Sequence, residues 1–417
     1  MVYEYKLREE KEGASLLDIH AGSAKRLSEA EYLELKQKVL ADNKLSQKYK
    51  LILPKVPRES LSGLSLTAPA RIYFELTRKC NLRCKTCFNE SGSALNKELS
   101  TEEIFNILAQ LNELGTFEIR FTGGEPTYRK DFFDIIKRAK ELGFYVSMGT
   151  NGAYEGDFVQ KVMASGVDWY IVSLDGDEER NDFIRGKGTY TKVLATLKAL
   201  SAAKKRIRLN MVVGKHNVDC IQTLAKLCDE LRIESFNLIP LRPYGRFDIF
   251  LKDKMLSSKE FYDFIRLLDE LRKRHKVKFV TTLDLLNKDN LSKQDLIVRK
   301  EKTCAAGVEG AVISPQGEIY GCSYSPASTP DDSDAEARDI FVAGNLRKRA
   351  LSDIWLDDKR WAVFRNLDKY KNDKCHSCKY YCKECVGSCP IMSYYTDKTL
   401  DSFDPYCFKE IMECENA

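Results

Sequence analysis

The stretch Cys80-Asn81-Leu82-Arg83-Cys84-Lys85-Thr86-Cys87-Phe88 holds three cysteines within eight positions. A cubane iron–sulfur cluster has four irons, and each of them is normally held by one thiolate. Three thiolates therefore leave one iron open to bind another molecule, and an open iron can support chemistry as well as electron storage. The spacing predicts a cluster of this open kind.

A structural zinc ion is the alternative for these three thiols. Structural zinc takes four ligands, and its usual unit is a Cys-x2-Cys pair matched by a second pair. No histidine and no fourth cysteine lies near the stretch in the sequence. The ligand count therefore disfavours zinc.

Length and composition are those of an ordinary globular protein. The 417 residues are enough for two or three packed units, and 43% of them are hydrophobic. The apolar runs are too short to span a bilayer, and the charged N-terminus is unlike a signal peptide. We therefore expect a soluble, cytoplasmic protein with no membrane partner. The net charge of +5, from 67 basic and 62 acidic residues, makes no case for nucleic acid as a partner.

Short apolar runs alternate with helical patterns before Cys304, which is typical of repeated β-α units and a parallel sheet. Six units are too few for an eight-stranded barrel, so we expect an α/β fold of the partial (β/α)6 TIM-like type. In such folds the site lies at the carboxyl ends of the strands. The expected strands span residues 71–76, 118–122, 144–149, 169–174, 206–213 and 235–240.

Local signals mark several helix ends in this region. Ser100 with Glu103 forms a capping box at one helix start, and Ser257 with Glu260 forms another. Two glycines, Gly115 and Gly143, are expected to end helices. The helices between the expected strands therefore have defined boundaries.

The second expected strand ends in Gly123-Gly124-Glu125-Pro126. Two glycines let the backbone approach a ligand closely, and Glu125 can accept a hydrogen bond from an ammonium group. Taken alone, the tetrapeptide could also be a plain turn.

Together, Cys-x3-Cys-x2-Cys-aromatic and Gly-Gly-Glu-Pro resemble the radical SAM superfamily. The resemblance implies that the open iron chelates the amino and carboxylate groups of S-adenosylmethionine (SAM) and passes one electron to its sulfonium. The product implied is a 5′-deoxyadenosyl radical, which takes a hydrogen atom from an unreactive C–H bond. It also implies that Cys80, Cys84 and Cys87 hold a [4Fe-4S] cluster, and that Gly123, Gly124, Glu125 and Pro126 hold the amino group of SAM.

The same resemblance implies further contacts with SAM at later strand ends. Groups suited to its ribose and methionyl parts are Thr150 and Asn151 after the third strand, and Ser173 and Asp175 after the fourth. Arg185 is a candidate for the SAM carboxylate and Asn210 a further candidate, although each could equally be a surface residue. Phe88 is expected to lie against the adenine, mostly through its backbone.

The C-terminal third is rich in cysteine, and its pattern resembles the SPASM extension of radical SAM enzymes. The pattern begins with Cys304-x12-Gly317-x4-Cys322 and ends at Cys407. The resemblance implies two auxiliary [4Fe-4S] clusters. The first would be held by Cys304, Cys322 and Cys389, and the second by Cys375, Cys378, Cys385 and Cys407.

Several alternatives stay open for this region. Cys382 could replace Cys385, because the gap after Cys378 is one residue longer than in the family. The first auxiliary cluster could be open to substrate, or be completed by Cys382, Cys414 or a carboxylate. A zinc knuckle is the alternative for Cys375, Cys378, Cys385 and Cys389.

Three other positions complete the reading of the later chain. Cys220 and Cys228 lie in an amphipathic stretch and are expected to be buried structural thiols. Ser323 stands where the sulfatase maturases of the family place an aspartate, which argues against that activity.

The first residues predict a hairpin followed by a helix. Alternating apolar residues from Tyr3 lead to a turn at Gly13, residues 14–19 can pair back, and Ser28 with Glu31 caps a helix. This order resembles the start of a small winged-helix domain that binds leader peptides. An extension that packs on the barrel is the alternative.

We therefore expect three domains, at residues 1–66, 67–285 and 286–417. The function expected is a radical SAM/SPASM maturase that acts on a ribosomally made peptide, with a flavodoxin or ferredoxin as reducing partner. The alternatives are a small-molecule or full-size protein substrate, and a non-catalytic electron carrier. An electron carrier has no need for an open iron or a Gly-Gly-Glu-Pro turn.

Overall fold

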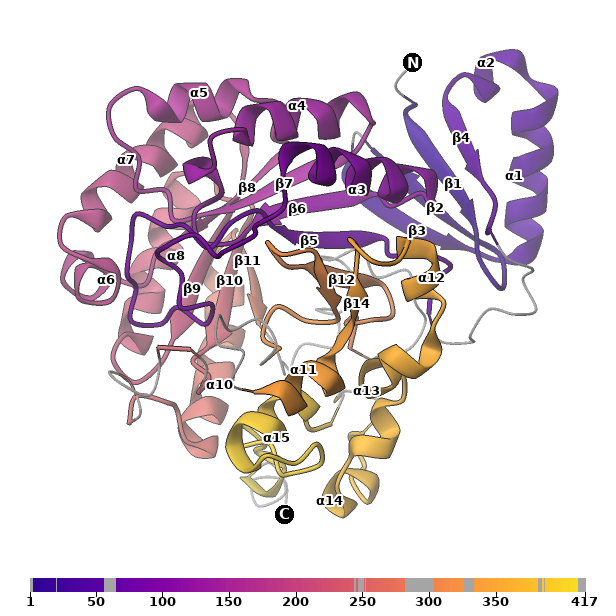
Figure 1. Cartoon of the computed structure of the whole chain (residues 1–417). Coiled ribbons are helices and arrows are strands. Elements are labelled where there is room, and N and C mark those ends of the chain that lie inside the picture. Colours follow the sequence, from indigo (N-terminus) through magenta and orange to yellow (C-terminus); the bar gives the residue numbers. More distant parts are fainter. Residues whose placement is uncertain are drawn as a thin grey trace. The chain divides into compact units, whose positions relative to one another are not determined.

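The computed structural model of the chain describes residues 3–19, 21–55, 65–243, 245–246, 251, 253–281, 304–325, 334–381, 385 and 387–411. Figure 1 shows the helices and strands, coloured along the sequence. The described residues divide into two units, each assembled from separate stretches of sequence. Unit 1 comprises Met1–Thr77, Ala94–Ser147 and Ser292–Leu367. Unit 2 comprises Arg78–Ser93, Met148–Leu291 and Asp368–Ala417.

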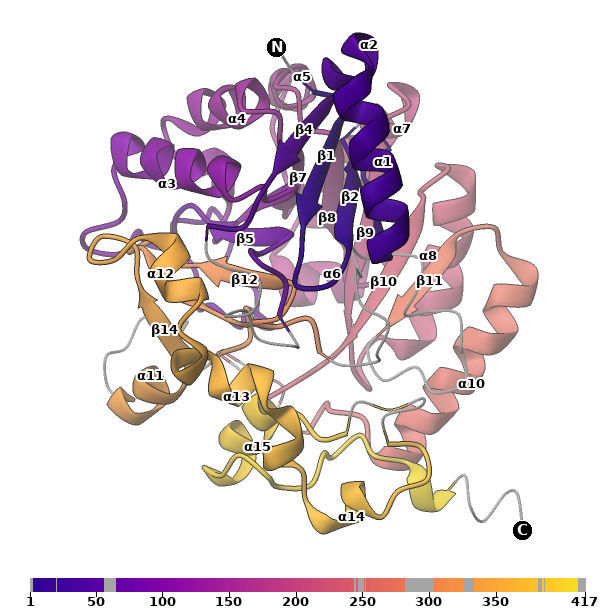
Figure 2. The ribbon, with the colours of Figure 1, turned by 90° about the vertical axis from the view of Figure 1, so that its right-hand side faces the viewer.

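Unit 1 begins with a four-stranded sheet in the order β3-β2-β1-β4. The strands β1 to β3 are antiparallel, and β4 runs parallel to β1. Helix α1 lies against this sheet (Figure 2), where Tyr32 packs with Leu7, Ala14 and Leu27. The elements are β1 Tyr5–Glu9, β2 Ala14–Asp18, β3 Ser23–Leu27, α1 Glu29–Ala41, α2 Asn43–Ser46 and β4 Tyr49–Ile52.

The face of this sheet opposite the Leu7 side chain is charged yet buried. Lys6 and Arg8 are each only 1% exposed. Lys6 Nζ donates to Thr116 O at 2.8 Å, and Arg8 Nε contacts Glu10 Oε1 at 2.9 Å. The expected hairpin and helix are confirmed, and β3 and β4 enlarge them into a sheet that is fastened to the rest of unit 1.

The second sheet of unit 1 runs in the order β6-β5-β12-β13-β14. Strand β5 is parallel to both β6 and β12, whereas β13 is antiparallel to its neighbours. Its elements, with the helices of this unit, are β5 Arg71–Glu75, α3 Thr101–Glu113, β6 Glu118–Thr122, η2 Pro126–Tyr128, α4 Phe132–Glu141, β12 Gly310–Ile313, β13 Glu318–Tyr320, α11 Ala335–Phe341, β14 Val342–Asn345, α12 Leu351–Trp355, η5 Asp358–Trp361 and α13 Ala362–Arg365.

Unit 2 contains parallel strands that alternate with helices. Strand β7 begins in unit 1 and ends in unit 2, where β8, β9, β10 and β11 follow it in order. The elements are β7 Tyr145–Thr150, α5 Phe158–Ala164, β8 Trp169–Ser173, α6 Glu178–Arg185, α7 Thr189–Ala202, β9 Arg206–Val213, η3 Val218–Cys220, α8 Ile221–Glu230, β10 Ser235–Pro240, α10 Ser258–Arg274, β11 Lys278–Thr281, α14 Asp373–His376 and α15 Pro390–Asp397. The short η6 Leu367–Tyr370 crosses the unit boundary.

The predicted α/β fold with parallel β-α units is confirmed. All six expected strands are present, each within about one residue of its expected bounds. Both capping boxes of the barrel region form as expected, at Ser100 and Ser257. Gly115 and Gly143 have φ angles of 77° and 73°, directly after their helices. The predicted domain boundaries stay predictions.

Two further expectations concern burial and membranes. Cys220 and Cys228 are 4% and 0% exposed, so their prediction as buried thiols is confirmed. Among the described helices, none combines the length and the apolar character that crossing a bilayer requires.

Candidate functional site

The three N-terminal cysteines lie on the cysteine loop, Arg78–Ser93, which follows β5 in the chain. Backbone hydrogen bonds close the loop, from Cys80 N to Gly92 O at 3.0 Å and from Gly92 N to Arg78 O at 2.8 Å. The loop has almost no regular secondary structure. These closing bonds give the cysteines a defined place despite the lack of a helix or strand.

Gly245 and Arg246 hold this loop from a segment that follows β10. Arg246 Nε donates to Cys84 O at 2.9 Å. Gly245 has a φ of 61°, and a Cβ there would lie 2.3 Å from Cys87 O. Only glycine fits so close to the loop. Neither residue was predicted from the sequence, although a Gly-Arg pair shortly after a strand end was the available signal.

All three sulfurs of the loop receive hydrogen-bond donors. The N–H groups of Leu82 and Ser91 each lie 3.4 Å from a sulfur, that of Cys80 and that of Cys87. Arg185 Nη1 lies 3.9 Å from Cys84 Sγ. N–H donors to sulfur stabilise thiolate ligands and tune the potential of a cluster. The donor set of three thiols therefore fits an iron–sulfur cluster.

Arg185 lies at the end of α6 and is 9% exposed, so it is not a surface residue. Its Nη2 lies 2.9 Å from Oδ2 of Asp175, which is fully buried. Burial alone would lower the pKa of Arg185, but the Asp175 carboxylate and the Cys84 thiol raise it above its ordinary value. Arg185 is thus a fixed cation beside the Cys84 sulfur.

Asp175 accepts hydrogen bonds from two other residues of its own unit. Its Oδ1 accepts from Val212 N at 2.8 Å, and its backbone carbonyl accepts from Asn217 Nδ2 at 2.8 Å. The carboxylate therefore orients Arg185. Direct contact between Asp175 and SAM stays a prediction.

Burial raises the pKa of Cys84 to about 12, and the nearby thiols of Cys87 and Cys80 add to the effect. The guanidinium of Arg185 opposes it. Because the thiolate is the form that binds metal, iron has to displace a firmly held proton at this position.

The Gly-Gly-Glu-Pro turn, Gly123 to Pro126, follows β6 in unit 1. Gly124 N donates to Thr77 O at 2.7 Å. Gly123 has a φ of 133°, and a Cβ there would lie 2.4 Å from the same carbonyl. Glu125 is fully buried and accepts from Thr127 Oγ1 at 2.8 Å. The glycines thus let the turn lie directly against the end of β5.

The remaining SAM candidates lie at strand ends of unit 2. Asn151 Nδ2 donates to Asn81 Oδ1 at 2.8 Å and lies 3.8 Å from Cys80 Sγ, so it belongs to the surroundings of the cysteine loop. Thr150 is buried, and its Oγ1 lies 2.8 Å from the hydroxyl of Tyr154. Their contacts with SAM stay predictions.

Three more candidates have a defined place without a tested role. Ser173 and Asn210 are partners in the register of β8 and β9, and Asn210 Oδ1 accepts from Asn237 Nδ2 at 3.1 Å. Phe88 is half-buried. Its backbone carbonyl oxygen lies 2.6 Å from the position that a Cβ on Gly245 would occupy. Contact of these residues with SAM also stays a prediction.

Four C-terminal thiols gather in unit 2. Burial raises the pKa of Cys385 to about 11, and the thiols of Cys407, Cys375 and Cys378 add to that rise. Gly387 N donates to Cys385 Sγ at 3.3 Å. These are the four residues predicted for the second auxiliary cluster. Their assignment to a cluster stays a prediction.

The predicted first auxiliary set is divided between the units. Cys304 and Cys322 belong to unit 1, and Cys389 belongs to unit 2. Cys382 and Cys414 lie outside the described residues, so the alternatives that involve them stay open. This cluster therefore stays a prediction.

Within the described ranges, no three His, Cys, Asp or Glu side chains are grouped so that they could hold a metal ion among them. The assignment of the cysteines to iron–sulfur clusters therefore stays a prediction.

Comparison with known proteins places these features in a family. The model of the radical SAM superfamily matches residues 74–228, which include the cysteine loop, the Gly-Gly-Glu-Pro turn and Arg185. Residues 74–228 form a radical SAM domain. The model of the SPASM iron–sulfur cluster-binding domain matches residues 304–379. This radical SAM enzyme therefore has the two domain types whose cofactors are SAM and [4Fe-4S] clusters, as the motifs predicted.

Similar proteins include two kinds of curated enzyme. The AdoMet-dependent heme synthase of Methanosarcina barkeri is 27% identical over 356 residues, covering 82% of this chain and 96% of that protein. The mycofactocin maturase MftC of Mycolicibacterium smegmatis is 29% identical over 350 residues, covering 82% and 83%. Both similarities extend over most of this radical SAM enzyme.

Solved structures share the fold. SuiB of Streptococcus suis, in crystals with S-adenosylmethionine, superimposes with a TM-score of 0.71 at 19% identity, covering 97% of this chain and 98% of SuiB. The structure of anSMEcpe with bound AdoMet gives a TM-score of 0.65 and covers 84% of this chain. The likeness to SuiB thus includes the N-terminal sheet of this radical SAM enzyme.

Proposed function

We propose that this radical SAM enzyme is a maturase that modifies a ribosomally made peptide. The observation that carries the proposal is the cysteine loop, whose three sulfurs each receive an N–H donor and whose Cys84 has the fixed cation Arg185 beside it. When bound, the cluster supplies the electron that cleaves SAM to a 5′-deoxyadenosyl radical, which takes a hydrogen atom from the substrate.

The side chains of this chain bind and orient SAM in the proposal. The buried Arg185, held by Asp175, provides the positive charge for the SAM carboxylate. The Gly-Gly-Glu-Pro turn receives the amino group, and Thr150, Asn151, Ser173 and Asn210 offer hydroxyl and amide groups to the ribose and methionyl parts. Arg185 belongs to an ion pair that is already complete, so it needs little reorganisation when the ligand binds.

Two features support a peptide as the substrate. The relatives include the maturase MftC, and SuiB has been crystallised with its precursor peptide SuiA. The N-terminal sheet of this chain ends at strand β3, which is an edge strand. An extended leader segment could add to such an edge by backbone hydrogen bonds. We assign residues 1–66 to leader binding on this basis.

A one-electron donor completes the proposed reaction. Reductive cleavage of SAM consumes an electron, so the enzyme needs a low-potential carrier such as a flavodoxin or a ferredoxin. Carriers of this kind work in the cytoplasm, which is where we place the enzyme.

A small-molecule substrate is the second candidate. The observation that favours it is the 27% identity with an AdoMet-dependent heme synthase over 82% of this chain. The N-terminal sheet is the discriminating feature, because a small molecule has no leader segment to bind there. A truncation is too severe a test, since Lys6 and Arg8 of that sheet are buried against unit 1.

The test uses protein that is purified and reconstituted without oxygen. With dithionite and SAM, the wild type should form 5′-deoxyadenosine, and the Cys84→Ala variant should not, because it lacks a cluster ligand. If a short reading frame lies next to this one, the peptide that it encodes is then added, and mass spectrometry should detect a loss of hydrogen or a crosslink. No 5′-deoxyadenosine above the Cys84→Ala level would leave an electron carrier as the better assignment.

A further inference from the structure

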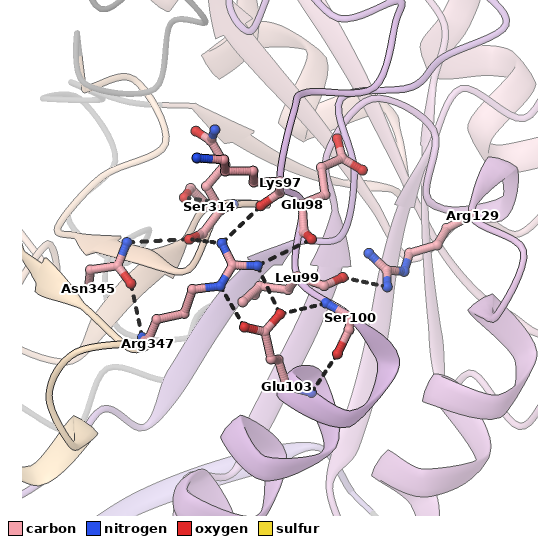
Figure 3. Close-up of polar contacts among 10 residues, drawn as sticks. Lys97, Glu98, Leu99, Ser100, Glu103, Arg129, Ser314, Asn345 and Arg347 are labelled. Atoms are coloured by element: carbon pink, nitrogen blue, oxygen red, sulfur yellow. Dashed lines mark hydrogen bonds and ion pairs between the residues drawn. The ribbon is translucent and has the colours of Figure 1, made fainter.

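Arg347, two residues after β14, binds two segments of unit 1 that are far apart in the sequence, residues 97–103 and the turn at Gln316 (Figure 3). Its Nε and Nη2 hold the two carboxylate oxygens of Glu103 at 2.6 and 2.8 Å. Its Nη groups also donate to Lys97 O, Glu98 O and Gln316 O at 2.9, 3.2 and 3.3 Å. A guanidinium that grips a carboxylate with two bonds fixes direction as well as distance.

Glu103 therefore has two tasks. It completes the capping box with Ser100 at the start of α3, and it receives the fork of Arg347. The hydrogen bonds from Arg347 and from the Ser100 backbone lower the pKa of Glu103 to about 2. The carboxylate is thus ionised at any working pH, and the beginning of α3 is bound to the segment that follows β14.

The turn between β12 and β13 forms hydrogen bonds with residues 96–99 as well. Leu99 N donates to Pro315 O at 2.7 Å, and Gln316 Nε2 donates to Asn96 O at 2.9 Å. Gly317 has a φ of 85°, and a Cβ there would lie 3.1 Å from the Leu99 side chain. Strand β13 ends two residues before Cys322. Residues 96–99 therefore contact the β12–β13 hairpin that precedes this cysteine.

Arg129 links this stretch to the Gly-Gly-Glu-Pro turn. It lies three residues after Pro126 and donates through Nη2 to Leu99 O at 2.7 Å (Figure 3). Its Nη1 donates to Leu76 O at 3.1 Å, directly after β5. Arg347 thus binds the carbonyls just before Leu99, and Arg129 connects Leu99 O to the turn, where Arg129 N donates to Pro126 O at 3.1 Å.

We propose that Arg347 is a positioning residue for the binding of SAM, acting through Leu99 and Arg129 on the Gly-Gly-Glu-Pro turn. The proposal rests on the proposed function, because it takes this turn as the site of the SAM amino group. Without Arg347, the backbone carbonyls of Lys97 and Glu98 lose two hydrogen bonds, and the neighbouring Leu99 carbonyl, which accepts from Arg129, is held less firmly. The turn then samples more positions, and SAM binds more weakly.

Stability and positioning can be separated at this site. The side chains of Arg347 and Glu103 are 31% and 37% exposed. A partly exposed ion pair contributes little to the free energy of unfolding, because water screens it. A loss of SAM affinity without a large fall in melting temperature is therefore the signature of positioning.

The experiment measures the dissociation constant of SAM for the reconstituted enzyme, and KM and kcat for SAM in 5′-deoxyadenosine formation with dithionite and no peptide. Arg347→Met should raise KM and the dissociation constant about fivefold, with kcat within about twofold of wild type. Glu103→Gln can still cap α3 and should shift KM in the same direction. Arg347→Lys keeps the charge without the fork and should restore part of the affinity.

Arg349→Met is the matched control. Arg349 lies two residues further on and binds Asp357 at 3.2 Å and Asp353 O at 3.1 Å, both within its own segment. Its loss should leave KM for SAM unchanged. Unaltered KM in both Arg347→Met and Glu103→Gln would overturn the proposal, as would an equal rise in Arg349→Met.

Failure of the proposed function would look different. A wild type that binds SAM but forms no 5′-deoxyadenosine would remove the proposed chemistry. The dissociation constants of the wild type and the variants would still decide whether Arg347 positions the turn.

Discussion

Arg185 lies between the carboxylate of Asp175, 2.9 Å away, and the sulfur of Cys84, 3.9 Å away. The Arg185 guanidinium thus contacts a buried carboxylate on one side and a thiol on the other. Lys85 N donates to Ile184 O at 2.9 Å, which holds the end of α6 on the cysteine loop. The position of the cation is therefore set before any ligand binds.

Replacing Asp175 by Asn should leave Arg185 buried without its counter-charge. Removing one partner of a buried pair costs about 3–5 kcal/mol, so chemical denaturation should give a clearly lower free energy of unfolding. The variant should also lose 5′-deoxyadenosine formation, because Arg185 is free to turn away from the SAM carboxylate.

The control for this prediction is Asp177→Asn. Asp177 is 41% exposed, pairs with Arg180 and caps α6, and asparagine is an equally good cap. Its free energy of unfolding should change by less than about 1 kcal/mol. Equal losses in the two variants would contradict a special role for Asp175.

Iron content should distinguish ligand cysteines from structural ones. Cys385→Ala should lose about four irons per chain in the reconstituted protein, the content of one cubane. Cys228→Ala should keep its iron, because Cys228 is a fully buried thiol of α8. Iron analysis and Mössbauer spectra provide the measurement.

Cys382→Ala decides the alternative that the sequence left open. If this variant loses the iron and Cys385→Ala retains it, then Cys382 is the ligand and the set of four thiols drawn from the structure is wrong.

Lys6 should make stability depend on alkaline pH. Burial, with help from Lys50 and Arg8, lowers the pKa of Lys6 well below its ordinary value. Between that lowered value and the ordinary one, the unfolded chain binds more protons than the folded chain. The free energy of unfolding should therefore rise with pH in this window, by up to about 1.4 kcal/mol per pH unit.

The measurement compares wild type with Lys6→Met by denaturation at several pH values. The free energy of unfolding of the wild type, minus that of Lys6→Met, should increase as the pH rises through this window. Lys48→Met, which removes a half-exposed lysine paired with Glu4, should follow the wild type at every pH. A Lys6→Met curve parallel to the wild type would show that Lys6 has its ordinary pKa.

Local sequence signals predicted the fold well where they were strong. The β-branched and aromatic runs gave six strands, and the capping boxes at Ser28, Ser100 and Ser257 all formed. Strand β3 was missed, because Ser23–Leu27 has only one strongly apolar residue at its end. Strand β12 was missed because its pairing with β5 is distant in sequence and carries no local pattern.

The site was predictable in the same uneven way. The cysteine loop and the Gly-Gly-Glu-Pro turn are contiguous, so their spacing alone pointed to them. Arg185 could not be told from a surface arginine, because its burial depends on Asp175 and on the loop. Arg347 and Glu103 are 244 positions apart, and no spacing rule connects residues at that distance.

The buried, charged face of the N-terminal sheet, which carries Lys6 and Arg8, bears on which residue of a bound peptide would be modified. Lys6 and Arg8 fasten that sheet to backbone at residues 115 and 116, which belongs to the same unit as the Gly-Gly-Glu-Pro turn. A leader peptide bound at β3 would thus lie at a constant distance from the Gly-Gly-Glu-Pro turn. The number of residues between the bound leader and the modified side chain would then determine which side chain reacts. Lengthening the leader by a few residues would move the modification to a different side chain.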